Sequence, residues 1–124
     1  PDFYATCVQF TTAWAEESNR QNPDVPGILY RSYAGAMDSP RCDLFLWWEN
    51  LIIGWVEGEN DGLVTVKSAR WTGFQEVWRG VKGRGVSHMD EVDFRRRPLK
   101  ARGESWDVID EYITMVAQLK ESGL

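Results

Sequence analysis

Residues 57–64 read EGENDGLV, an acidic turn that runs into the apolar start of a predicted strand. A second stretch, residues 83–93, reads GRGVSHMDEVD and contains His88, the only histidine of the chain. A predicted helix and short strand precede both stretches, and this order is typical of an α/β layer. We therefore expect an α/β fold.

The region before these loops is predicted to contain one helix and one strand. Phe3, Cys7, Phe10 and Trp14 recur at spacings of three and four, so residues 3–18 are predicted to form a helix that packs one face on a core. The prolines of residues 22–27 end that helix, because proline lacks an amide donor. Residues 28–33 follow as a short apolar and aromatic strand.

The remaining elements are predicted from patterning and caps. Residues 43–56 are apolar on almost every side, and Asp43 as a possible N-cap favours a helix over the first ten of them. Residues 63–67 and 75–79 are strand candidates. Ser105 is the expected N-cap of a helix that runs to about residue 122, with acidic residues early and Lys120 late.

Length and composition predict one domain, residues 1–124. A hydrophobic content of 43% with seven tryptophans is ample material for a core, so Trp47, Trp48 and Trp55 are expected to be buried, although a lipid-accepting cleft also needs such a surface. No apolar run approaches the roughly 18 residues of a transmembrane helix. Cys7 and Cys42 either pair or stay as two thiols, and they lack the spacing of a zinc site.

Charge is distributed unevenly along the chain. The net charge is −5, yet residues 79–102 hold eight basic and three acidic groups. Arg95, Arg96 and Arg97 follow Asp90, Glu91 and Asp93, which are near enough to neutralise them. Because the rest of the chain is strongly acidic and would oppose phosphate, we expect an internally paired face and no nucleic-acid partner.

Asp61 and His88 are the candidate chemical residues. Alone, Asn60 and Asp61 before Gly62 are more simply a tight turn, and a single histidine is more often a surface or hydrogen-bonded residue. Their flanks carry a more specific signal. Residues 22–27 with 30–35, residues 57–64 and residues 85–93 resemble, in this order, the strand entry, the acid loop and the histidine loop of bacterial triacylglycerol lipases and esterases of the α/β-hydrolase superfamily.

The resemblance implies that this chain is the carboxy-terminal portion of an α/β-hydrolase fold, with parallel strands and packing helices, incomplete alone. It implies a serine lipase or carboxylesterase that hydrolyses acylglycerol-type esters, in which Asp61 and His88 are the acid and base of the triad. It also implies that each of the two side chains stands on a loop after a strand, at one end of the sheet. A G-x-S-x-G elbow is missing, and Ser87 is too close to His88 to be the nucleophile. We expect the serine in a missing amino-terminal part, so this segment alone should be inactive.

The resemblance also implies a structural calcium ion that braces the histidine loop. Asp90, two positions after His88, matches one ligand, and Asp38 is the best match for another, with Asp43 in reserve. Phe94 stands where some relatives carry a glutamine ligand. Surface carboxylates or loop caps are the simpler interpretation of these aspartates. The lipase resemblance slightly favours a secreted protein.

Two other classes of function stay open. The chain is alternatively a noncatalytic module in which exposed tryptophans bind a hydrophobic ligand or another protein. It is also compatible with a structural subunit that completes a hydrolase made of two chains.

Overall fold

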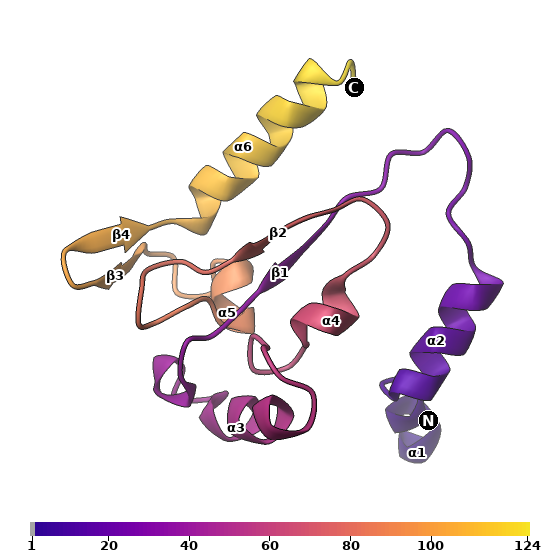
Figure 1. The fold of residues 1–124 in the computed structure, drawn as a ribbon, viewed down its shortest axis with the longest axis horizontal. Coiled ribbons are helices and arrows are strands. Elements are labelled where there is room, and N and C mark those ends of the chain that lie inside the picture. The colour runs from indigo at the N-terminus through magenta and orange to yellow at the C-terminus, as the bar shows by residue number, and fades with distance from the viewer. Residues whose placement is uncertain (1) are drawn as a thin grey trace. The chain divides into compact units, whose positions relative to one another are not determined.

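The computed structural model describes residues 2–124, which form two compact units, one ending at Tyr30 and one beginning at Arg31. Figure 1 shows the ribbon with its elements labelled. Each unit is described by itself.

The first unit contains two helices, α1 (Phe3–Val8) and α2 (Thr12–Gln21). The continuous helix predicted over residues 3–18 is therefore wrong at residues 9–11. Thr11 explains the break, because its hydroxyl donates to the carbonyl of Val8 (2.7 Å) and accepts the amide of Trp14 (3.3 Å). Neither helix has a buried residue, so the expected packing of this segment on a core is not seen within the unit.

The second unit is built around two short parallel strands, β1 (Ser32–Gly35) and β2 (Phe74–Trp78). Ala34 pairs with Val77, and Gly35 pairs with Trp78. The prediction for β2 is confirmed within one residue, whereas β1 begins four residues later than predicted. The shift follows from pairing: Ser32 bonds both the amide and the carbonyl of Trp71 through its hydroxyl, and this fixes where the two segments meet.

Two helices lie between the paired strands in sequence, after a short turn of 3₁₀ helix, η1 (Pro40–Cys42). Helix α3 (Trp47–Val56) begins later than predicted from Asp43, and α4 (Val66–Ala69) replaces the strand predicted over residues 63–67. The Thr65 side chain caps α4 by accepting the amide of Ser68 at 3.0 Å. A local cap therefore outweighs the strand preference of a short valine-rich stretch.

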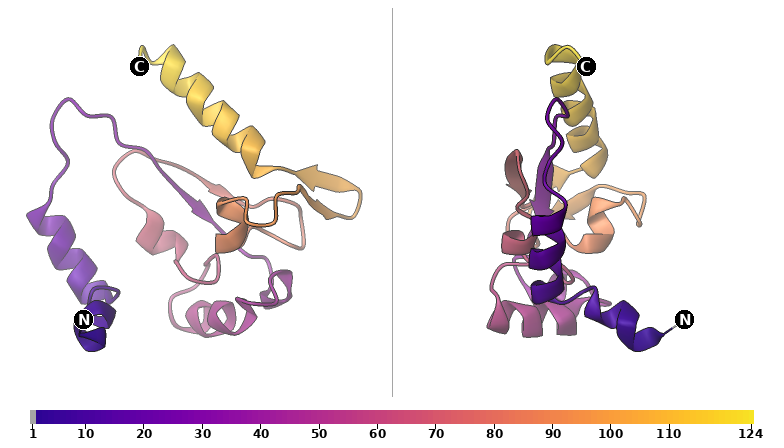
Figure 2. Two further views of the ribbon diagram at one scale, coloured as in Figure 1. Left: turned by 180° about the vertical axis from the view of Figure 1, so that it is seen from behind. Right: turned by 90° about the vertical axis from the view of Figure 1, so that its right-hand side faces the viewer.

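The chain ends in α5 (His88–Glu91), a hairpin of β3 (Leu99–Ala101) and β4 (Glu104–Trp106), and the long helix α6 (Val108–Glu121). Arg102 and Gly103 both have positive φ and form the two-residue turn of the hairpin. Ser105, the predicted N-cap, lies in β4, and Asp107 caps α6 instead. Figure 2 shows the hairpin and α6 from two further sides.

The core of the second unit is small. Trp78, buried in β2, packs with Val81, Val86, Leu99 and Val108. Its indole ring is surrounded by other aromatic rings, with centroids 5.2 Å from Tyr33, 6.2 Å from Trp106 and 5.9 Å from Tyr112. A second cluster of Ala34, Ala36 and Val66 lies beside α4.

Most large apolar side chains lie outside this core. Trp47, Trp48 and Trp55 on α3 are 45%, 53% and 89% exposed, so the expectation that they are buried is wrong. Cys7 is exposed and Cys42 is half-buried, and both are free thiols. Among the described residues, no helix is both long enough and apolar enough to span a membrane.

Candidate active site

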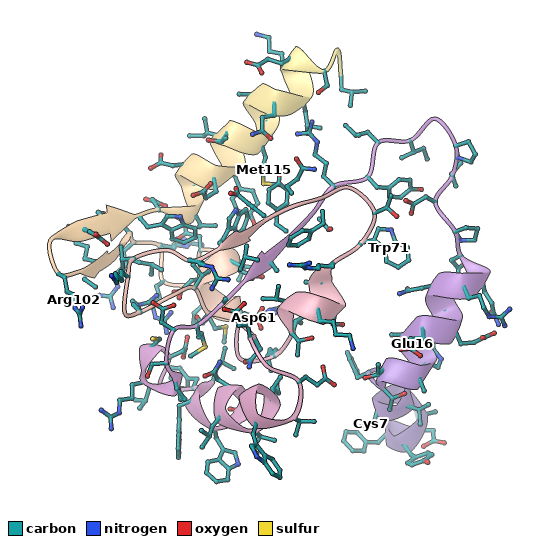
Figure 3. All side chains as sticks on the ribbon, in the orientation of Figure 1. Cys7, Glu16, Asp61, Trp71, Arg102 and Met115 are labelled. Carbon is teal, nitrogen blue, oxygen red and sulfur yellow. The ribbon has the colours of Figure 1, made fainter. Side chains whose placement is uncertain are left out.

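Asp61 lies in a tight loop after α3, and its carboxylate organises that loop (Figure 3). Its Oδ1 accepts the amides of Leu63 (2.8 Å) and Val64 (2.7 Å), so one oxygen of the buried side chain is fully used by the backbone. Gly62, with φ +103°, completes the turn, and a Cβ there would lie 2.7 Å from the Cβ of Leu46. The interpretation of Asp61 as a turn residue is therefore compatible with its interpretation as a candidate chemical residue, because the turn uses only Oδ1 of the carboxylate.

Asn60 anchors the acid loop, although the sequence marked it only as a turn residue. Its buried side chain accepts hydrogen bonds from Asn50 of α3 (2.7 Å) and from the amide of Gly62 (2.9 Å). Its backbone carbonyl accepts the amide of Met37, just beyond β1, at 2.9 Å. The loop is thus tied both to a helix and to the end of the sheet.

His88 is the first residue of α5, and the turn before it is constrained by Gly85. Gly85 has φ +76° and pairs with Met37; a Cβ there would collide with the backbone of residues 36–38. Ser87 then caps α5 in a capping box with Asp90. These local rules place the imidazole of His88 at the start of the helix.

The structure brings Asp61 and His88 together at two points. The Nδ1 of His88 lies 2.7 Å from Oδ2 of Asp61, and the backbone amide of His88 donates to the carbonyl of Asp61 at 2.9 Å. The side chain of Asp61 is 3% exposed and that of His88 is 38% exposed. An ionised Asp61 requires the proton on Nδ1, which leaves Nε2 as the basic nitrogen of the neutral ring. This is the arrangement of an acid and a general base in a triad.

The surroundings differ in one respect from the expected strand-and-loop geometry. Asp61 follows a helix and a bend, not a strand, while His88 lies beyond β2 and begins a helix. A small pocket of about 70 Å³ lies beside the pair, between β1, α4 and α5. It has room for water and is too small for an acyl chain.

Glu91 is a third carboxyl group at the site, and from the sequence it was expected only to help neutralise the basic run of residues 95–97. Its Oε2 lies 3.8 Å from Nδ1 of His88, and its side chain packs against Gly35 at the end of β1. Burial, followed by the negative charge of Asp61, raises the pKa of Glu91 to about 7, against an opposing effect of His88. Its position three residues after His88, on the same helical turn, was the available signal.

Asp61, His88 and Glu91 each offer a ligand atom, and these atoms lie within 4.8 Å of one another. A metal ion would have to replace the 2.7 Å contact between Nδ1 and Oδ2. The other oxygen of Asp61 already accepts two amides. The three groups therefore fit a hydrogen-bonded acid–base cluster better than a metal centre.

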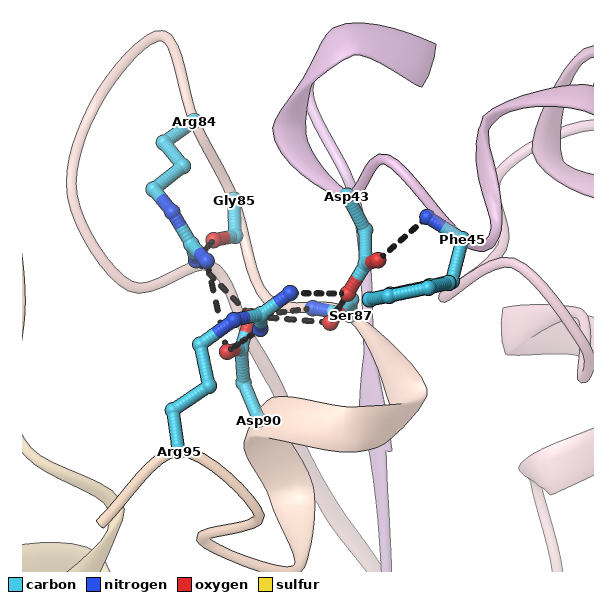
Figure 4. Close-up of polar contacts among 7 residues, drawn as sticks. All are labelled: Asp43, Phe45, Arg84, Gly85, Ser87, Asp90 and Arg95. Atoms are coloured by element: carbon cyan, nitrogen blue, oxygen red, sulfur yellow. Dashed lines mark hydrogen bonds and ion pairs between the residues drawn. The ribbon is translucent and has the colours of Figure 1, made fainter. Parts of the chain in front are cut away.

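A buried ionic cluster surrounds Ser87, the residue before His88 (Figure 4). Arg95 donates to Asp43 at 2.7 Å and also pairs with Asp90, which in turn accepts from Arg84 at 2.8 Å. The Ser87 hydroxyl lies 2.7 Å from Asp43 and 2.9 Å from Asp90, and its single proton can serve only one of them at a time. Ser87 is fully buried in this cluster, which excludes it as the nucleophile in this conformation.

The pKa values within the cluster follow from its pairing. Burial alone would raise the pKa of Asp43, but hydrogen bonds from Arg95, Ser87 and the amide of Phe45 hold it below its ordinary value. Burial opposes the same change in Asp90, where Arg84 and the amide of Ser87 lower the pKa. Both carboxylates are therefore ionised at neutral pH, and the arginines are their counterions.

The residues predicted to hold calcium are not brought together in the expected way. Asp38 is not part of the cluster around Asp90; its carboxylate accepts the amide of Gly83 at 2.6 Å. Asp43, the reserve candidate, is the aspartate that shares partners with Asp90. Because arginines and Ser87 already occupy both oxygens of Asp90, the donor set fits a calcium ion poorly in this arrangement. The calcium site stays an untested prediction.

The basic run of residues 95–97 is neutralised in part by nearby acids, as the sequence predicts. Arg95 is paired with Asp90 and Asp43.

No protein-family model, curated protein or solved structure matches this chain.

Proposed function

We propose that this chain carries the acid and base of a serine ester hydrolase, with Asp61 as the acid and His88 as the base. The observation that carries the proposal is the double connection between the two residues. Their side chains meet at 2.7 Å, and the amide of His88 donates to the carbonyl of Asp61 at 2.9 Å. A surface histidine that meets a carboxylate by chance would not need the second, backbone contact.

The roles follow from the orientation of the imidazole. Nε2 of His88 accepts the proton of a serine hydroxyl as its oxygen attacks the ester carbonyl, and returns that proton to the departing alcohol. Asp61 holds the Nδ1–H tautomer and stabilises the imidazolium that forms. Its low exposure keeps this interaction out of water, where it would be weakened.

The serine and the oxyanion hole are proposed to lie in an upstream part of the same polypeptide or in a second chain. Two features support this. β1 and β2 form a sheet of only two strands in the described part of the chain, so each has an edge available for pairing. Large apolar side chains on α3, including Trp55 and Leu51, lack cover within the described residues. The substrate class we propose is a lipid or small carboxylic ester.

A fluorophosphonate probe tests the proposal on the full-length polypeptide, meaning this chain together with any part of the protein that precedes it. Labelling of one serine outside this chain is expected, and His88→Ala should abolish it because the hydroxyl loses its base. Glu57→Gln, an exposed acidic-to-amide change beside the acid loop, is the matched control and should label normally. Undiminished labelling of the folded His88→Ala variant would contradict the proposal.

A noncatalytic interaction module is the second candidate, and the exposure of Trp47, Trp48 and Trp55 favours it. Such a module would bind a hydrophobic ligand or protein through α3, and His88 would be an ordinary loop residue. The same probe separates the two. The module predicts no labelled serine in any variant, together with a loss of ligand binding when Trp48 is replaced by alanine.

A further inference from the structure

Arg95 connects two segments that are far apart in the sequence. Its guanidinium donates to Oδ2 of Asp43, which follows η1, and pairs with Oδ1 of Asp90 in α5. The side chains of Asp43 and Asp90 are 0% and 2% exposed, and that of Arg95 is 23% exposed. Figure 4 shows the guanidinium between the two carboxylates.

We infer that Arg95 is a positioning residue for His88, whose guanidinium acts as a built-in cation that clamps the Asp43 segment to the histidine loop. This inference rests on the proposed function, in which His88 is the general base. The chemistry of the clamp is that of a divalent-cation site between two carboxylates, filled by a side chain of the chain itself.

The contacts of Asp90 connect the clamp to His88. Asp90 Oδ2 accepts the backbone amide of Ser87 at 3.0 Å, and Ser87 directly precedes His88. The Ser87 hydroxyl lies between Asp43 and Asp90, so both carboxylates hold the residue before the base. On its other side, His88 is held by the hydrogen bond that its backbone amide donates to the carbonyl of Asp61. The orientation of the imidazole therefore depends on both Asp61 and the clamp.

The charges of the clamp explain why the guanidinium is needed. Asp43 and Asp90 would repel each other without a cation between them, and both are nearly excluded from water. Arg84 neutralises Asp90 from a second direction, but within residues 2–124 Asp43 forms an ion pair with Arg95 alone. Removing Arg95 leaves two buried carboxylates with one counterion, and an added cation would then be attracted to the space.

Arg95→Ala in the full-length polypeptide is the test, with the exposed neighbour Arg97→Ala as the matched control. The first readout is the ring ¹⁵N spectrum of His88, identified by its absence in His88→Ala. In the parent protein we expect one tautomer with a low-field Nδ1–H signal that chelator does not change. In Arg95→Ala we expect that signal to broaden or disappear, and added guanidinium or Ca²⁺ to restore it.

The second readout is turnover of a soluble ester. Arg95→Ala should lower kcat by about 100-fold with KM little changed, because a misplaced base affects the chemical step more than binding. Restoration by Ca²⁺ should be lost in the double variant Asp43→Asn/Arg95→Ala, which has one carboxylate fewer. Arg95→Lys keeps the charge but cannot span both carboxylates in a fork, and should give an intermediate decrease.

The outcomes separate the inference from the proposed function. If Arg95→Ala folds with unchanged His88 signals and kcat, the clamp is overturned, while probe labelling still supports the hydrolase. If no serine is labelled but the His88 signals respond as expected, the clamp stands as a structural device and the proposed function fails. If Arg95→Ala does not fold, Arg95→Lys decides by the same signals. Loss of the His88 signal from the parent protein on adding chelator, with recovery in Ca²⁺, would overturn the clamp.

Discussion

The loops around Asp61 and His88 and the surface of α3 differ in how their side chains are satisfied. In the loops, several buried polar side chains have partners within the second unit: Asp61 with two amides and an imidazole, Asn60 with Asn50, and Asp43 with Arg95. On α3, most of the large apolar side chains are exposed to solvent, and Trp55 is 89% exposed. The polar region is the better satisfied of the two.

This difference indicates that the geometry of the two loops is determined by contacts within this chain, whereas the apolar surface of α3 is not covered by it. Hydrogen bonds are short-range and directional, so the two loops determine their geometry by bonding to each other and to β1. Apolar side chains are stabilised in proportion to the area removed from water, and that area depends on what covers them. We propose that α3 is covered by a part of the protein outside this chain, whereas the acid–base geometry is complete within it.

Asp61→Asn should have the largest effect, because it changes the contact between Asp61 and His88 at the centre of the polar region. The amide keeps an oxygen for the amides of Leu63 and Val64, so the loop should remain folded. It no longer enforces the Nδ1–H tautomer of His88, and kcat should fall by about 10⁴-fold. Steady-state kinetics of the full-length polypeptide, with circular dichroism as a check of folding, measures this. A decrease below tenfold would remove Asp61 from the proposed triad.

Gly85→Ala should destabilise the histidine loop strongly. Gly85 has φ +76°, and an added Cβ would lie 2.7 Å from Cα of Met37. Gly103, with φ +84°, has nothing within 4 Å and is the matched control, because it shares the backbone strain without the collision. The expected loss in the free energy of unfolding is about 3 kcal/mol at Gly85 and about 1 kcal/mol at Gly103, measured by urea unfolding. Equal losses would show that the close approach is unimportant.

Trp55→Ala tests the other side of the comparison. If the upstream part covers α3 in the full-length polypeptide, the substitution should lower the free energy of unfolding by about 3 kcal/mol. Glu49→Ala on the same helix is the control, with an expected change within about 0.5 kcal/mol. A loss as small as the control's would mean that the surface is open, which favours the interaction module.

Glu91→Gln should have the smallest effect, and its sign depends on pH. The pKa of Glu91 is raised from 4.5 to about 7 on folding, so its stabilising effect is fully present below about pH 4.5 and is lost as the pH rises through about 7. Glutamine mimics the protonated acid. The variant should match the parent near pH 4 and be more stable by about 1–3 kcal/mol near pH 8. Urea unfolding at both pH values measures this, and a difference independent of pH would contradict it.

The elements predicted best from sequence were those specified by local patterns. β2 and most of α6 were confirmed because a short alternating strand and a long amphipathic helix carry their own signal. β1 was misplaced because its start depends on Ser32 meeting Trp71 across the sheet. The break between α1 and α2 was missed because the Thr11 hydroxyl donates to one helix and accepts from the other. Apolar periodicity does not indicate such side-chain hydrogen bonds.

The sequence marked two residues of the candidate site, Asp61 and His88, and left most of their surroundings unpredicted. The turn at Asp61 and the glycine-rich approach to His88 were visible as local signals, and the contact between them was expected only through a resemblance. Asn60, Glu91 and Arg95 were each noticed for another reason, as a turn residue, an acid and part of a basic run. Their roles depend on contacts with Asn50, Gly35 and Asp43, which are distant in sequence.

The sequence by itself determined the α/β character of the chain, the turns of its loops and the chemical types at the site, because these depend on neighbouring residues. Only the tertiary structure decided that Asp61 meets His88 at the ring nitrogen Nδ1, that Asp43 rather than Asp38 joins Asp90, and that Arg95 lies between them. The physical reason is that electrostatic and hydrogen-bonding energies depend on distance in space, and distance along the chain does not specify it.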